Sequence, residues 1–103
     1  MNKLQNTTAD LLGRVEDWYR GECNGDWEHS YGVKIDTLDN PGWLVTIDFA
    51  ETEWSDLKVD RVVVQRTETD WVQTEVTNAQ FIGCGGPKNL SEVLEMFLGI
   101  VGV

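Results

Sequence analysis

The sequence has few of the residues that build metal, redox or disulfide-stabilised sites. It contains two cysteines, one histidine and two prolines in 103 residues. Cys23 and Cys84 lie far apart, and in a reducing compartment we expect two free thiols rather than a disulfide. Zinc sites use three or four nitrogen or sulfur ligands, so this set argues against a bound metal. We expect no cofactor.

Long apolar runs and basic residues are also scarce. No segment approaches the ~18 apolar residues that cross a bilayer, and the first residues lack the apolar stretch of a signal peptide. We therefore expect a cytoplasmic protein that binds no membrane. Eight Lys and Arg against 18 Asp and Glu give a net charge of −10. This charge disfavours nucleic acid, because phosphates repel such a surface, and favours a basic protein partner.

What the chain does contain is enough for one folded domain. Hydrophobic residues make up 41% of the sequence and include five tryptophans. A chain of this length and composition can bury a core without disulfide or metal support. We expect a single domain over residues 1–103.

Helical periodicity marks both ends of the chain. Leu11, Leu12, Val15, Trp18 and Tyr19 recur at helical spacing, which predicts a helix over about 8–20. Thr7 or Thr8 is its expected N-cap and Gly21 its expected stop. A second apolar stripe predicts a helix from about Asn89, with the Asn89 side chain as cap and Glu92 completing a capping box.

Alternating patterns predict strands between the two helices. The alternation of Trp27, His29, Tyr31, Val33 and Ile35 predicts a strand over 27–36, with His29 as a hydrogen-bonded core histidine. Residues 40–43 (Asn-Pro-Gly-Trp) predict a type II turn, with a positive φ at the glycine, and 43–49 the returning strand. Further strands are expected over about 59–66, 71–77 and 80–84.

This order predicts an α+β fold. We expect an antiparallel sheet of four or five strands in a meander. An antiparallel sheet with one apolar face needs a cover, and the N- and C-terminal helices supply it in a two-layer arrangement.

Two patterns suggest a small enzyme as an alternative. Asp26 and Glu28 would share a strand face at roughly 7 Å, a possible acid–base pair. Cys84 stands in a glycine-rich run, Gly83–Gly86, where backbone amides can activate a thiol if His29 serves as base. The plainer interpretations are a surface pair and a turn whose glycines adopt unusual φ values. A homodimer formed through the apolar C-terminal helix is a third possibility.

The charge pattern points to a protein-binding surface. No basic residue occurs between Lys34 and Lys58, whereas acids are frequent there and a tryptophan stands among them. Such a surface steers a basic partner and offers an aromatic contact. The predicted partner-binding residues are Glu28, Asp36, Asp39, Asp48, Glu51, Glu53, Trp54 and Asp56.

The residues from Trp18 to about Asp48 resemble the bacterial immunity protein 53 family. The similarity rests on Trp18-Tyr19, on Cys23 to His29, on Tyr31-Gly32, and on Thr37 to Trp43. The resemblance implies a non-enzymatic protein that binds and neutralises a cognate toxin of a polymorphic toxin system. With the charge pattern, we expect a basic toxin as partner, no nucleic acid or membrane, and a monomer or weak homodimer.

Overall fold

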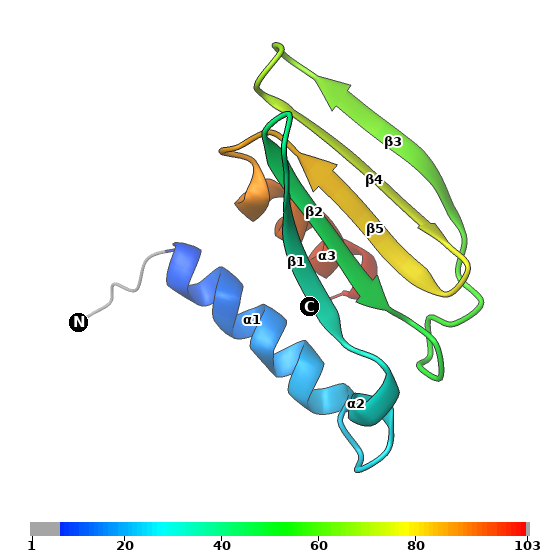
Figure 1. Cartoon of the computed structure of the whole chain (residues 1–103). Helices are drawn as coiled ribbons and strands as arrows, with labels where there is room; N and C mark the ends of the chain where they lie inside the picture. The colour runs from blue at the N-terminus through cyan, green and yellow to red at the C-terminus, as the bar shows by residue number, and fades with distance from the viewer. Residues whose placement is uncertain (1–6, 103) are drawn as a thin grey trace.

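The chain forms a five-stranded antiparallel sheet with helices packed on one face, as seen in a computed structural model that describes residues 7–102 (Figure 1). The elements are, in chain order, α1 (Thr7–Glu22), α2 (Trp27–Ser30), β1 (Val33–Leu38), β2 (Gly42–Asp48), β3 (Val59–Gln65), β4 (Trp71–Thr77), β5 (Gln80–Gly85) and α3 (Leu90–Val101). The predicted α+β fold, with terminal helices and an antiparallel sheet, is confirmed. No helix in this part of the chain is long and apolar enough to span a membrane.

The strand order differs from a simple meander. The sheet runs β1-β2-β5-β4-β3, so β5 pairs with both β2 and β4, and the chain after β2 crosses to the far edge. The Val62-Val63-Val64 run of β3 resembles a central strand, but Asp60, Arg61 and Gln65 flank it and most of β3 is exposed. Charged flanks are typical of edge strands, and β3 occupies an edge.

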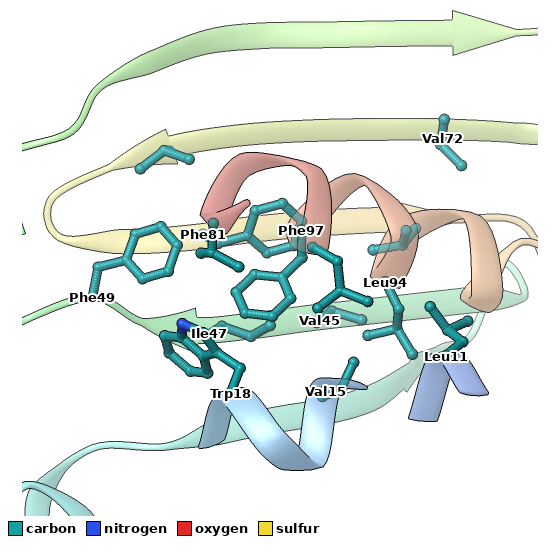
Figure 2. Packing of buried hydrophobic residues seen from close by; sticks show 14 of the residues in the cluster. Leu11, Val15, Trp18, Val45, Ile47, Phe49, Val72, Phe81, Leu94 and Phe97 are labelled. Atoms are coloured by element: carbon teal, nitrogen blue, oxygen red, sulfur yellow. The ribbon is translucent and has the colours of Figure 1, made fainter. Parts of the chain in front are cut away.

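The core lies between α3 and the inner faces of the three central strands (Figure 2). Val45, Ile47, Phe49, Val72 and Phe81 point from the sheet side into it and are fully buried. The apolar stripe of α3 meets them through Val93, Leu94, Phe97, Leu98 and Val101. The α3 stripe is thus used within the chain, which leaves little of it for the dimer contact considered from the sequence.

The first helix uses only part of its predicted apolar stripe. Leu11, Val15 and Trp18 are buried, whereas Leu12 is 49% and Tyr19 40% exposed. The helix passes the predicted stop at Gly21 and ends at Glu22. The side chains of Thr7 and Thr8, its predicted caps, lie outside the described part.

The segment predicted as the first half of a strand is a short helix instead. The Asn24 side chain accepts hydrogen bonds from the amides of Asp26 and Trp27, and the Glu28 carboxylate accepts them from Asn24 and Gly25. These four local bonds curl the chain into α2, overriding the alternating pattern. Trp27 is buried as predicted, but His29 is exposed, so its assignment as a core histidine is wrong.

The glycines of the sheet serve close packing rather than unusual backbone angles. Among the described glycines only Gly25 and Gly102 have positive φ, so the predicted type II turn at Gly42 and the unusual φ values expected for Gly83–Gly86 are wrong. A Cβ on Gly42 would lie 2.3 Å from the Gly85 carbonyl oxygen, and one on Gly83 would lie 2.6 Å from Val93 Cγ1. The missing side chains let β2 approach β5, and α3 approach β5.

Asn89 joins α3 to the β3–β4 turn and does not cap the helix in the predicted way. Its Nδ2 donates to Asp70 and Glu92, and its Oδ1 accepts from the Trp71 amide. Arg66 bonds to both carboxylates, which holds the pKa of Asp70 below its usual value with help from Asn89. The expected capping box is replaced by a tertiary network.

The close approach at Gly42 predicts a specific sensitivity. Gly42→Ala should lower the free energy of unfolding by about 1–3 kcal/mol, because the new methyl group meets backbone that cannot rotate away. Gly32→Ala is the matched control, since no atom lies within 4 Å of a Cβ there. Denaturant unfolding of the two variants checks this, and equal stabilities would contradict the packing role of Gly42.

Candidate partner-binding surface

The eight predicted residues occupy two ends of the β1–β2 hairpin rather than one continuous face. Asp36 in β1 and Asp39 in the turn are exposed toward one end. Asp48 is the last residue of β2 and lies at the other end of the hairpin, about 20 Å along the strand from Gly42. Glu28 and the loop residues Glu51, Glu53, Trp54 and Asp56 lie at the Asp48 end. The structure therefore separates Asp36 and Asp39 from the other six.

The Asp48 end gathers acids from three segments distant in sequence. The Trp27 Nε1 donates to the Ala50 carbonyl at 2.9 Å, which attaches α2 to the β2–β3 loop. Figure 1 shows the end of α1, α2 and this loop at the same end of the molecule. Glu22, at the end of α1, belongs to it as well. We call this set the acidic end, and it comprises Glu22, Glu28, Asp48, Glu51, Glu53 and Asp56.

Like charges meet within the acidic end. Partial burial raises the pKa of Glu22, and the nearby charge of Glu53 raises it further. Glu22 also stands in the last turn of α1, where the helix dipole disfavours a negative charge. Glu51 adopts a φ of 62°, a left-handed conformation that costs energy for a residue with a Cβ. The fold thus holds these carboxylates together although their arrangement is locally unfavourable.

Two carboxylates of the acidic end are fixed by hydrogen bonds. Glu28 accepts the amides of Asn24 and Gly25 at 2.9 and 2.8 Å. Its own backbone amide and these two hold the pKa of Glu28 below its usual value. Asp48 accepts the Gly32 amide and the Gln80 side-chain amide, both at 3.0 Å. Both carboxylates are therefore held in place before any partner arrives.

A groove of about 580 Å³ adjoins these two carboxylates. It lies between α1 and the start of β1, with α2 at its end. Val15 and Val33 give it an apolar lining, and Tyr19 and Tyr31 add aromatic rings. Three acids, Glu16, Glu28 and Asp48, contribute to its wall, against one lysine, Lys34. An aromatic groove bordered by fixed carboxylates suits a lysine or arginine side chain, through ion pairing and cation–π contact.

Trp54 is less available than the sequence indicates. Its ring packs against Trp18 and Phe49, with centroid distances of 6.0 and 5.9 Å, and the residue is half-buried. Trp54 therefore packs against the core, and only part of its ring is exposed to a partner. Trp71 is half-buried like Trp54, but it lies on the sheet face opposite the helices.

The residues considered for catalysis lie in different places. His29 lines the groove beside α1, whereas Cys84 lines a separate hollow on the open sheet face with Arg61 and Glu75. Burial raises the pKa of the Cys84 thiol, which makes it a poorer nucleophile. Glu28 of the Asp26/Glu28 pair is engaged with backbone amides. Residues 7–102 contain no group of three His, Cys, Asp or Glu side chains that could hold a metal.

Two residues of this surface were not predicted from the sequence. Tyr19 has the spacing of the core stripe, and its exposure could not be read from that spacing. Glu22 was missed because it precedes the acidic stretch. Its position in the last turn of a helix, where basic residues are usual, was the available signal.

Comparison with known proteins identifies the family of this chain. A family model described as immunity protein 53 matches residues 12–102. The chain belongs to the immunity protein 53 family. No curated protein and no solved structure matches the chain.

In this family member, the residues that carried the resemblance have structural roles. Trp18 and Trp27 are buried in the core, and Asn24 and Glu28 form α2. The Trp43 Nε1 donates to the Pro87 carbonyl at 3.0 Å. The motif residues therefore contribute to the core, to the turn before α2 and to the contact between Trp43 and Pro87.

The anchoring of Glu28 predicts a pH-dependent contribution to stability. Because its pKa is lower in the folded chain, ionised Glu28 stabilises the fold above its unfolded pKa of ~4.3, and the contribution is lost as the pH falls through the folded value. Glu28→Gln should lower the melting temperature at pH 7, and this deficit should shrink as the pH falls through the folded pKa of Glu28. A deficit that stays constant into the acid range would contradict this account. Glu16→Gln, an exposed acid of α1, serves as control.

Proposed function

We propose that this protein binds a cognate bacterial toxin and neutralises it, without an enzymatic reaction of its own. Membership of the immunity protein 53 family carries the proposal. The net charge of −10 supports a basic toxin as partner. The two free thiols, Cys23 and Cys84, are compatible with the cytoplasm as its compartment.

The acidic end is the part of the molecule that we assign to the toxin. Acids in positions that weaken the fold are expected where function requires them, because activity and stability often compete. Glu22 and Glu53 repel each other, yet the fold brings them together. Glu28 and Asp48 are held by backbone and side-chain amides, so binding would cost little ordering of these side chains.

The mechanism follows from charge complementarity. Toxins that act on nucleic acids or other anions carry basic active sites, and carboxylates can occupy the places of the substrate's anionic groups. The loop residues Glu51, Glu53 and Asp56 would steer the toxin over a long range. A basic side chain of the toxin would enter the groove between Tyr19 and Tyr31, next to Glu28 and Asp48. The toxin's active site would then be covered.

The first test is binding and protection. Co-purification with the protein encoded beside its gene should give a stable complex, and co-expression should protect cells from that toxin. If the two proteins neither associate nor show protection, the proposed function is wrong.

The second test separates the acidic end from overall charge. Reversal of Glu51, Glu53 and Asp56 to Lys should slow association with this toxin about tenfold at low salt, because steering depends on local charge. Reversal of Asp39, Glu68 and Glu95 changes the net charge equally at exposed positions outside the acidic end. Stopped-flow association rates decide the matter. Equal slowing by both triple variants would remove the assignment to the acidic end.

Glu22→Gln should affect stability and binding in opposite directions. Removing a charge whose pKa is raised by burial and by Glu53 should raise the melting temperature at pH 7. Because the ionised form is the unfavourable one, the gain should fade as the pH drops below the folded pKa of Glu22. The same variant should associate more slowly with the toxin. Thermal melts against pH measure the first effect, and a lower melting temperature at pH 7 would contradict it.

A further inference from the structure

The edge strand β1 is regular and uninterrupted. The other edge, β3, carries a register irregularity between Val59 and Val62, a usual device against strand pairing. The β1–β2 ladder is continuous over all six residues of β1. No proline interrupts β1, and Ile35 is 43% exposed.

The hydrogen-bond pattern shows which groups β1 offers. The Asp48 amide donates to the Gly32 carbonyl at 3.0 Å, and bonding alternates along an antiparallel pair. Lys34 and Asp36 therefore bond to β2 through their backbone. Val33, Ile35 and Thr37 direct their N–H and C=O groups away from the sheet. These three residues form a row of donors and acceptors that another strand can use.

We propose that β1 pairs with β1 of a second copy of this chain, in antiparallel register centred on Ile35. In this register Ile35 faces its own equivalent and Val33 faces Thr37 of the second copy. Lys34 stands directly opposite Asp36, twice, at a pair whose backbones do not hydrogen-bond and whose side chains are therefore closer. The two sheets join into one of ten strands.

The sequence of β1 selects this register against its neighbours. Outward-directed residues must pair with each other, so the next possible registers shift the two strands relative to one another by two residues. One shift places Lys34 opposite Lys34, and the other places Asp36 opposite Asp36. Like charges directly opposite destabilise a strand pair, whereas opposite charges stabilise it. Of these three registers, only the one centred on Ile35 places Lys34 and Asp36 opposite residues of opposite charge.

The side chains agree with pairing at this edge. Ile35 pairs with the buried Val45 in the sheet and so lies on the helical face, yet α1 leaves it exposed. A second copy of β1 would cover Ile35 and bury it against its equivalent. The net charge of −10 on each copy opposes association, but salt screens it beyond about 8 Å at physiological ionic strength. A weak, concentration-dependent dimer is the expected result.

Charge-swap variants test the register. Sedimentation of the full chain over a concentration series should show a reversible dimer. Lys34→Asp or Asp36→Lys alone should each raise the dissociation constant about tenfold, because both cross-strand pairs become repulsive. The double variant, which keeps the net charge at the wild-type value, should restore it. A chain that stays monomeric to its solubility limit would overturn the proposal, as would a double variant that fails to recover.

Proline variants test the edge itself. The Ile35 N–H is directed outward, so Ile35→Pro should abolish the dimer without breaking the β1–β2 ladder. Val63→Pro is the matched control. Val63 is an exposed valine of the other edge strand. The Arg66 backbone amide bonds to the Asp70 carbonyl, and because bonding alternates along the pair, the Val63 N–H is directed outward. Loss of the dimer with Val63→Pro, or its persistence with a folded Ile35→Pro, would overturn the proposal. If either proline variant does not fold, the charge-swap variants still test the proposal.

Discussion

A cluster of aromatic rings joins α1, α2 and α3 beside the acidic end. Trp18 of α1 meets Phe97 of α3 edge-on at 5.0 Å and Trp27 of α2 at 6.0 Å, and Phe49 and Trp54 complete its surroundings. Such pairs contribute about 0.5–1.5 kcal/mol each beyond the area they bury. Together with the buried Leu11 and Val15 of α1 and the Trp27–Ala50 hydrogen bond, this cluster positions α1 and α2 relative to the sheet. The groove and the acidic end depend on that position.

The cluster also explains why the molecule tolerates local costs. The Trp18 Nε1 is buried without a hydrogen-bond acceptor in the described part of the chain. An unpaired buried donor costs about 1–3 kcal/mol, which the four ring contacts of Trp18 have to outweigh. The acids above the cluster add repulsion at Glu22 and backbone strain at Glu51. The packed aromatic rings stabilise this end of the fold against these local costs.

The sequence predicted those features that depend on local periodicity. Both long helices and four of the strands follow from their apolar spacing, because burial on one side imposes that spacing. Prediction from spacing failed at α2, where hydrogen bonds from nearby amides to Asn24 and Glu28 override an alternating pattern. It also failed at the glycines. Gly42 and Gly83 look like turn residues in the sequence, but their role is to admit a neighbouring backbone or helix, which depends on partners distant in the chain. The strand order was wrong for the same reason.

The acidic surface was predicted only in part. The base-free stretch marked the loop acids and Asp48, together with Asp36 and Asp39, which lie toward the other end of the β1–β2 hairpin. Glu22 and Tyr19 come from α1 and reach the surface through tertiary packing. Amide hydrogen exchange of the protein, free and bound to the toxin encoded beside its gene, shows whether the toxin binds at the acidic end. We expect new protection in α2, at residues 50–56 and along the groove side of α1. Protection confined to the open sheet face, with none at the acidic end, would contradict it.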